Sequence, residues 1–361
     1  MTQPVDSGRV LVIGMGLIGG SVALGLKEQG FSVSGVDLDD TREAEALRLG
    51  IIDAIGDDLS ADLVVVCVPA ASVVEVVGEV LANPLRSADV IVTDVCGVKV
   101  PLVTAMRDVR FIGGHPMAGS EQLGLDGARA DLFVGATWVL TPGPTTDASR
   151  YARLSSIVAR LGAMPLALDA ADHDRLVAVV SHVPHLLAAT LMHRAVIGAA
   201  SDGALLQLAA GGFRDMTRVA AGDPAIWPEL CAANATAITA TLDQVIGDLH
   251  DLRAMVSTGD RSGLERFLTA SSTARRALPA KQVVPKSLVL LKVVVTDRPG
   301  ILADVTTVAS DLQVNVVDLQ IAHSVEGGAG VLQLTIDELR SQDLRRALVE
   351  RGYRCTLEAL A

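Results

Sequence analysis

The chain has 361 residues, half of them hydrophobic, and a formal net charge of −12 at pH 7. This length predicts two or three domains of roughly 100–200 residues each. An acidic chain without a long basic run excludes tight nucleic-acid binding, which depends on clustered Lys and Arg. The four cysteines stand far apart, which predicts reduced thiols and no metal site. Without a signal peptide or an uninterrupted apolar run of about 18 residues, we expect a cytoplasmic protein that does not enter a membrane.

Short apolar runs alternate with helical stretches in the first half of the chain. Strands are predicted at residues 9–13, 31–37, 61–68, 90–94, 110–113 and 138–141, and a helix at residues 21–29. Such alternation predicts a Rossmann-type α/β domain, in which a parallel sheet carries helices on both faces. We assign residues 8–171 to it.

The pattern changes near Asp172, from where Ala- and Leu-rich helical segments continue to about Leu278. Helices this apolar bury their faces against something beyond themselves. We therefore expect residues 172–280 to form an all-helical domain through which the chain forms a homodimer.

A third domain is expected at the end of the chain. Residues 280–286 contain two basic residues and a proline, as a linker does; strands are predicted at 287–296, 315–323 and 330–336, and helices at 301–312 and 342–351. Together these elements predict a small βαββα domain over residues 287–361.

The first strand leads into the motif Gly14-Met15-Gly16-Leu17-Ile18-Gly19, and a helix follows. In this context the glycines permit a sharp turn, the approach of a pyrophosphate and close packing of the helix, whose free N–H groups face the phosphates. Asp37, 18 residues beyond Gly19, ends the second strand, where a carboxylate binds the adenosine ribose and repels the 2′-phosphate of NADP. The predicted cofactor is NAD, which Val68 and Pro69 also contact at the end of the third strand.

Two histidine-containing clusters are candidate catalytic segments. His115 lies in a glycine-rich stretch after the fifth strand, at the sheet edge where α/β proteins bind ligands, and a histidine there suits general base catalysis. Ser181 and His185 share one face of a helix if Pro184 leaves the turn regular. The alternative for the second cluster is a set of polar residues at a helix start.

A third cluster contains Arg214 and Arg218, with Trp227 following in the segment 223–227. Arginines near a tryptophan in an acidic chain indicate carboxylate capture by the guanidinium group. The alternative is an ion pair with Asp215 that fixes two helices.

Taken together, these clusters resemble the prephenate/arogenate dehydrogenase family. The resemblance covers about residues 9–278 and rests on the segments GMGLIGGS (14–21), TDVCGVK (93–99), GHPMAGSE (114–121), SHVPH (181–185), 212–218 and 223–227. It implies a dinucleotide-binding domain, an intertwined helical dimerisation domain, and NAD-dependent oxidative decarboxylation of prephenate to 4-hydroxyphenylpyruvate in tyrosine biosynthesis. Arogenate dehydrogenase and the dual-specificity cyclohexadienyl dehydrogenase are alternatives, and a catalytically decayed amino-acid sensor is a remote one.

The resemblance also implies roles for single residues. His115 corresponds to the histidine that accepts the substrate's hydroxyl proton, and Arg218 to the arginine that binds a substrate carboxylate. The other implied substrate-site residues are Ser120, Glu121, Ser181, His185 and Trp227. Many family members have a serine that hydrogen-bonds the catalytic histidine, where this chain has Gly97. Cys96, Ser120 or water would then substitute, or His115 is held less rigidly.

The C-terminal domain resembles an ACT domain, a ligand-binding regulatory module, through Asp297-Arg298-Pro299-Gly300 after its first strand. The resemblance implies an amino-acid site at this turn, and tyrosine, as the end product, is the expected effector. The alternative is an ordinary strand–helix turn in a domain that only aids assembly.

Overall fold

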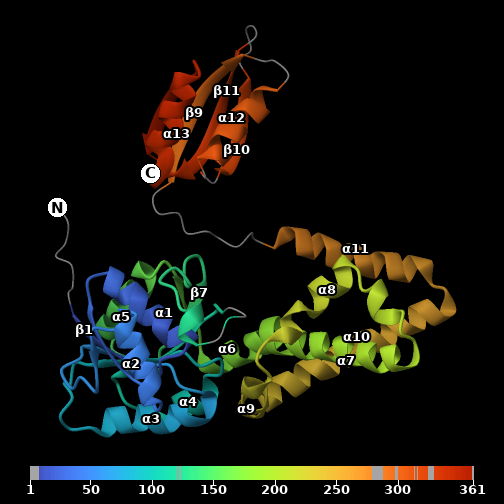
Figure 1. Ribbon diagram of the computed structural model, residues 1–361. Coiled ribbons are helices and arrows are strands. Elements are labelled where there is room, and N and C mark those ends of the chain that lie inside the picture. Colours follow the sequence, from blue (N-terminus) through green and yellow to red (C-terminus); the bar gives the residue numbers. More distant parts are fainter. Residues whose placement is uncertain are drawn as a thin grey trace. The chain divides into compact units, whose positions relative to one another are not determined.

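The computed structural model describes residues 8–119, 122, 124–278, 288–296, 300–312, 314, 316–323 and 329–359. The chain divides into two compact units, Met1–Gln282 and Val283–Ala361, and each has a hydrophobic core of its own (Figure 1). The predicted linker at residues 280–286 lies outside the described residues.

The first unit contains an eight-stranded sheet with the order β3-β2-β1-β4-β5-β6-β7-β8. Its strands are β1 (Arg9–Ile13), β2 (Ser32–Val36), β3 (Ala54–Ile55), β4 (Leu63–Val66), β5 (Ile91–Asp94), β6 (Phe111–Pro116), β7 (Thr137–Thr141) and β8 (Met164–Ala167). Strands β1 to β6 are parallel, whereas β7 is antiparallel to β6. The strand order reverses between β1 and β4, and such a switch point is where open α/β sheets bind ligands.

Helices cover both faces of this sheet, as the alternation of elements predicted. They are α1 (Leu17–Glu28), α2 (Asp40–Arg48), α3 (Ala70–Ala82), α4 (Val100–Ala105) and α5 (Ala148–Arg160). Because neighbouring strand residues point to opposite faces, Val10 and Val12 pack in the core with α1 and α5, while Leu11 packs with α3 and α4. The predicted α/β class is confirmed.

Helix α1 begins at Leu17, four residues before the predicted start at Ser21. Glycine lowers helix propensity, so Gly19 and Gly20 hid the first turn from the sequence analysis. Both glycines are buried, and a Cβ at Gly19 would lie 1.9 Å from the carbonyl oxygen of Gly14. Close packing of the helix on the turn therefore requires glycine where helix propensity disfavours it.

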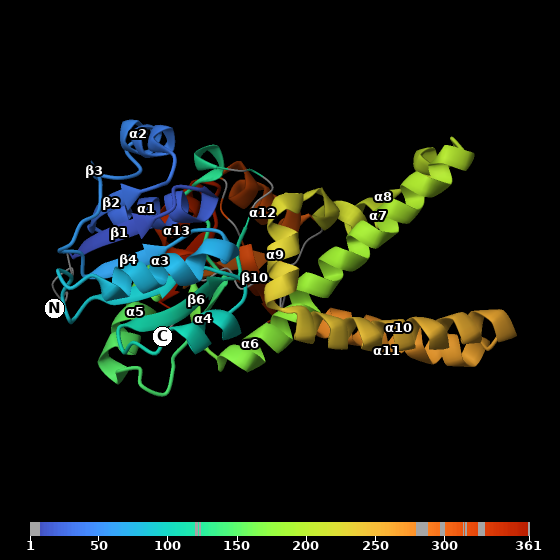
Figure 2. The ribbon, with the colours of Figure 1, turned by 90° about the horizontal axis from the view of Figure 1, so that it is seen from below.

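The second half of this unit is helical. Its elements are α6 (Ala170–Val177), η2 (Ala178–His182), α7 (Val183–Ser201), η3 (Leu205–Leu208), α8 (Gly211–Thr217), η4 (Arg218–Ala221), η5 (Pro224–Ile226), α9 (Trp227–Ala233), α10 (Ala235–Thr258) and α11 (Arg261–Ala277). Figure 2 shows α7, α10 and α11 projecting away from the sheet, and α9 contacts α3. Helix α9 thereby forms a wall beside the switch point.

The segment α6–η2–α7 forms one helix from Ala170 to Ser201 with a π-helical turn at η2. Pro184 follows this turn and has no N–H to donate, so the regular hydrogen-bonding pattern cannot continue through it. By length and composition this helix could cross a membrane, and it is the one such helix in the described part of the chain; 28% of its most apolar window is buried within the protein. Its exposed apolar residues include Val179, Val180, Val196 and Ile197.

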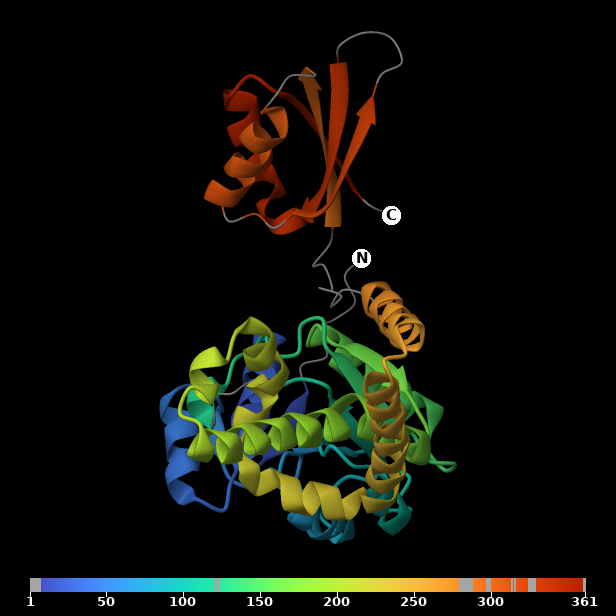
Figure 3. The ribbon, with the colours of Figure 1, turned by 90° about the vertical axis from the view of Figure 1, so that its right-hand side faces the viewer.

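The second unit is a four-stranded antiparallel sheet with the order β10-β11-β9-β12. Its elements are β9 (Leu288–Thr296), α12 (Ile301–Asp311), β10 (Val316–His323), β11 (Ala329–Asp337), α13 (Glu338–Glu350) and β12 (Arg354–Ala359). Both helices lie on one face of the sheet (Figure 3). Strand β12 extends the predicted βαββα arrangement to βαββαβ. The sequence analysis missed it because its polar and apolar residues alternate without a continuous apolar run.

Candidate active site

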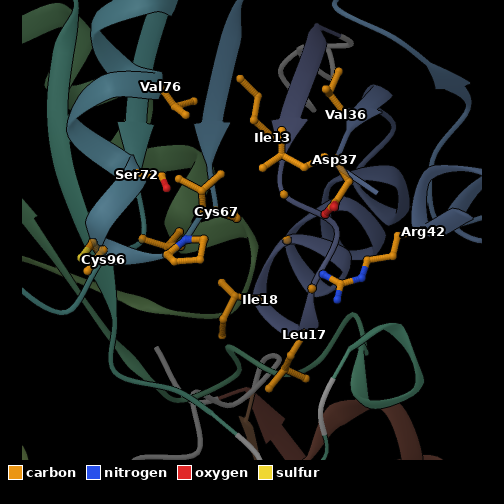
Figure 4. Close-up of a pocket in the computed structure, with 18 of the residues that line it drawn as sticks. Ile13, Leu17, Ile18, Val36, Asp37, Arg42, Cys67, Ser72, Val76 and Cys96 are labelled. Atoms are coloured by element: carbon orange, nitrogen blue, oxygen red, sulfur yellow. The ribbon is translucent and has the colours of Figure 1, made fainter. Parts of the chain in front are cut away.

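A pocket of about 1290 Å³ opens at the carboxyl ends of β1, β2 and β4. All eight residues predicted to bind the cofactor line it: Gly14, Gly16, Leu17, Ile18, Gly19, Asp37, Val68 and Pro69. Figure 4 shows Leu17, Ile18, Asp37 and Arg42 around this space. Ile226 and Leu230, from the helical half, also line the pocket. The site thus lies between the sheet and the helical half of the first unit.

The three motif glycines meet different steric demands. Gly14 has a φ of +99°, and a Cβ there would lie 2.5 Å from the carbonyl oxygen of Cys67. Gly19 touches Gly14, as described above. A Cβ at Gly16 would meet nothing within 4 Å. Gly16 therefore leaves the space into which a pyrophosphate can approach the backbone, while the other two glycines allow the turn to form.

The carboxylate of Asp37 is held beside this turn by backbone amides. Its Oδ2 accepts a hydrogen bond from the N–H of Met15 at 2.6 Å, and its Oδ1 accepts one from the N–H of Asp39 at 3.0 Å. A carboxylate oxygen can accept more than one hydrogen bond, so these contacts fix the side chain without preventing it from binding ribose hydroxyls.

A buried ion pair joins β5 to β6 next to the pocket. Asp94 and Lys99 form it, and both side chains are completely buried. The Asp94 carboxylate accepts hydrogen bonds from the N–H groups of Gly114 at 3.0 Å and Cys96 at 2.8 Å, and the Lys99 ammonium donates to the carbonyl oxygen of Gly114 at 2.7 Å. The pair therefore fixes the residue immediately before His115. The sequence analysis did not identify it.

His115 contacts a second histidine from the helical half. Its Nδ1 lies 2.8 Å from Nε2 of His173, whose own Nδ1 lies 2.7 Å from Oδ1 of Asp174. Burial lowers the pKa of His115 well below its ordinary 6.5, and the positive charge of Lys99 and the neighbouring His173 and His182 act in the same direction. His115 is therefore neutral at pH 7 and can accept a proton.

Gly97 faces the other edge of the His115 ring. A Cβ at this glycine would lie 3.7 Å from Nε2 of His115 and 3.5 Å from Cδ1 of Leu230. This is the position of the family's serine, and the chain has no hydroxyl there. Within the described residues, the hydrogen bond of the His115 ring goes to His173. His173 was not among the substitutes that the sequence analysis considered; of those, Ser120 lies outside the described residues, and Cys96 is a partly buried thiol in the pocket wall.

The second and third predicted clusters meet in the helical half. The rings of His185 and Trp227 stack with centroids 3.6 Å apart and planes 12° apart. Burial lowers the pKa of His185, and burial lowers the pKa of His182 to about 4, so both rings are neutral at pH 7. The Asn234 amide nitrogen lies 3.2 Å from Nδ1 of His182 and donates to the carbonyl oxygen of Asp174 at 2.8 Å.

The remaining predicted substrate residues lie on the same helices. Ser181 is half-buried on the π-helical turn, and Arg218 is exposed at the start of η4. The Nε of Arg214 donates to the carbonyl oxygen of Ala209 at 3.1 Å, a local contact within its own turn. Ser120 and Glu121 lie outside the described residues.

A parallel sheet with a phosphate-binding turn at its switch point, and a neutral histidine at the same edge, defines a dinucleotide-dependent dehydrogenase. Residues 22–166 match the family model for the prephenate dehydrogenase nucleotide-binding domain, and residues 169–270 match the model for the prephenate dehydrogenase dimerization domain. The chain belongs to the prephenate dehydrogenase family and is an NAD-dependent oxidoreductase.

Individual relatives agree with this assignment. The chain is 31% identical to the prephenate dehydrogenase of Bacillus subtilis over 96% of both chains, and 35% identical to the cyclohexadienyl dehydrogenase of Zymomonas mobilis over 74% of this chain and 95% of that one. The structure of Aquifex aeolicus prephenate dehydrogenase in complex with hydroxyphenyl propionate and NAD⁺ matches with a TM-score of 0.71 and 27% identity, covering 77% of this chain and 100% of that one. Synechocystis arogenate dehydrogenase matches with a TM-score of 0.64 and 32% identity, covering 74% and 99%.

Proposed function

We propose that this protein oxidises and decarboxylates prephenate to 4-hydroxyphenylpyruvate, with His115 as the general base. The observation that carries the proposal is a buried, neutral histidine at the edge of the sheet whose switch point holds the dinucleotide pocket. The full-length match to a prephenate dehydrogenase supports the choice of substrate.

In the proposed reaction, bound NAD accepts hydride from the ring carbon that carries the 4-hydroxyl group. His115 holds the hydroxyl proton while that carbon–oxygen bond gains carbonyl character. The bond to the ring carboxylate then breaks, and its electron pair restores the aromatic ring. His115 returns the proton to the phenol oxygen, so the enzyme ends the cycle in its starting protonation state. Aromatisation drives the step, and the protein's task is to position groups and to hold one proton.

The substrate's charged groups require local cations because the chain as a whole is acidic. Arg218 is proposed to hold a carboxylate, and Ser181, His185 and Trp227 to line the pocket. The stacked pair of His185 and Trp227 supports this, because it brings two segments that are distant in the sequence to one place. Ser120 and Glu121 belong to the proposed site through the resemblance alone.

The substrate is tested by measuring NADH formation with prephenate and with arogenate side by side. The two compounds differ in a keto or an amino group on the side chain, and turnover of arogenate alone would overturn the proposal. The His115→Asn variant is expected to lower kcat by about 10²–10⁴-fold, the contribution of a general base, while its affinity for NAD stays unchanged. A variant with near-wild-type kcat would exclude His115 as the base, and a wild-type protein inactive on both compounds would favour the sensor alternative.

We propose further that the chain forms a homodimer through its helical half. The matched model describes a dimerization domain, and exposed apolar residues occur along α7, α10 and α11. Sedimentation equilibrium of the full chain tests this, and a monomer at micromolar concentration would contradict it.

For the C-terminal unit we propose an ACT-like regulatory role with tyrosine as the effector. Solved relatives covered to 99–100% of their length match only 74–77% of this chain, so this unit adds to a dehydrogenase that is complete without it. Gly300, with φ +89°, begins α12 at the end of the proposed binding turn; Asp297, Arg298 and Pro299 lie outside the described residues. The N-terminus of such a helix offers free N–H groups to a carboxylate.

This role is tested by titrating tyrosine, phenylalanine and tryptophan against the full chain and a variant ending at Ala280. Tyrosine is expected to change the rate of the full chain only. If none of the three changes its rate or thermal midpoint, the regulatory role is wrong. If the shortened enzyme responds equally, the inhibitor acts at the catalytic site.

A further inference from the structure

We infer that His173 and Asp174 are positioning residues that fix the tautomer of His115 and leave its Nε2 as the basic atom. The inference rests on the proposed role of His115 as the base. It adds two residues that the sequence motifs did not identify, and it states which ring nitrogen accepts the substrate's proton.

The direction of the hydrogen bonds starts at Asp174. Its Oδ1 accepts a hydrogen bond from the N–H of Lys99 at 2.7 Å, and its Oδ2 accepts one from the N–H of Val100 at 2.8 Å. An ionised carboxylate can only accept hydrogen bonds. The third contact of this carboxylate, at 2.7 Å, is with Nδ1 of His173, so that nitrogen must carry the proton and donate it.

The proton on His173 Nδ1 determines the next contact. In a neutral imidazole the other nitrogen is an acceptor, so Nε2 of His173 accepts, and Nδ1 of His115 donates across 2.8 Å. The opposite tautomer of His115 would place two lone pairs against each other at that distance. Nε2 of His115 therefore keeps its lone pair, and it lies at the edge of the ring that faces Gly97.

The chain of contacts is shielded from water. His173 is 0% exposed and Asp174 is 3% exposed, so solvent does not compete for these hydrogen bonds. The charged or titratable groups that face His115 are Lys99, which is paired with Asp94, and the rings of His173 and His182. When His115 holds a proton, its Nδ1–H continues to donate to His173, and the carboxylate behind that ring stabilises the positive charge.

Two substitutions of similar size separate hydrogen bonding from packing. In His173→Gln, the amide oxygen can take the place of Nε2 and accept from His115, whereas His173→Leu fills the space without an acceptor. We expect the Leu variant to lose roughly 10²-fold in kcat, in the range of general base effects, and the Gln variant to stay within about fivefold of wild type. NAD affinity should be unchanged in both. The acid limb of the kcat/KM profile should move to lower pH in the Leu variant only, because the imidazolium of His115 has lost its acceptor.

The tautomer itself can be measured without turnover. In ¹⁵N-histidine-labelled wild-type protein, the His115 signal, assigned by its absence from His115→Asn, should show protonated Nδ1 and unprotonated Nε2 at neutral pH. A protonated Nε2 there overturns the inference even if the Leu variant does not fold. Equal losses of kcat in the Gln and Leu variants, or an unmoved acid limb, also overturn it and indicate packing alone. If His115→Asn keeps its kcat while Nε2 is unprotonated, the proposed base is wrong and the tautomer assignment stands.

Discussion

Replacing Lys99 with methionine tests the buried ion pair beneath the active site. The substitution keeps the length of the side chain but leaves the Asp94 carboxylate charged, fully buried and without its cation. Breaking a buried pair in this way costs about 3–5 kcal/mol in the free energy of unfolding. For a unit of this size, each kcal/mol lowers the thermal midpoint by about 2–4 °C. We therefore expect a decrease of about 6–20 °C.

Tryptophan fluorescence is a suitable assay because the chain's two tryptophans, Trp138 and Trp227, both lie in the first unit. Urea unfolding followed by this signal gives the free energy of unfolding of that unit. Combining Lys99→Met with Asp94→Asn should recover part of the loss, since the amide oxygen still accepts from Gly114 and no buried charge remains. The control is Arg48→Met, whose exposed partner Glu45 lies 3.3 Å away, and which should cost less than about 1 kcal/mol.

A loss below about 1 kcal/mol for Lys99→Met would refute the reasoning, and so would a double variant no more stable than the single one. The same substitution has a kinetic signature. The positive charge of Lys99 contributes to the lowered pKa of His115. Its removal should raise that pKa and move the acid limb of the kcat/KM profile to higher pH.

Three further substitutions test the pocket. Asp37→Ser should weaken NAD use and admit NADP, because the carboxylate that repels the 2′-phosphate is gone; an unchanged ratio of kcat/KM for the two cofactors would place Asp37 away from the ribose. Arg218→Ala should raise KM for the substrate and cost on the order of 2–4 kcal/mol in kcat/KM, with poor rescue by lysine; a normal KM with early unfolding would instead indicate a structural ion pair. Gly97→Ser should leave the thermal midpoint unchanged, because the added Cβ makes ordinary contacts at 3.5–3.7 Å, and its hydroxyl should move the acid limb of kcat/KM to lower pH by donating to Nε2 of His115. An identical pH profile would show that the hydroxyl does not reach the ring.

The sheet could be predicted where its strands are continuous apolar runs, as in β1, β4 and β5. The elements that were missed lack this signal. Strand β3 has two residues, β8 contains Pro165, and β12 alternates polar with apolar residues. Their formation depends on neighbouring strands, which a local pattern does not contain.

The same distinction applies to the site. The cofactor pocket is formed largely by consecutive residues of one motif, so its spacing is visible in the sequence. The contact between His115 and His173 joins residues 58 positions apart, and that between Lys99 and Asp174 joins residues 75 apart. Nothing near His173 marks its role, because its function arises only when the helical half folds against the sheet.

The π-helical turn at Ala178–His182 constrains how the length of this protein can vary. His173 and His185 lie on the same long helix, on opposite sides of that turn. Deleting one residue from the turn would restore a regular helix and rotate everything after it by about 100° about the helix axis. His185 would then leave the ring of Trp227, while His173 kept its place. Surface loops elsewhere in the chain can gain or lose residues, but here a change of one residue in length alters the angular phase between the two halves of the site.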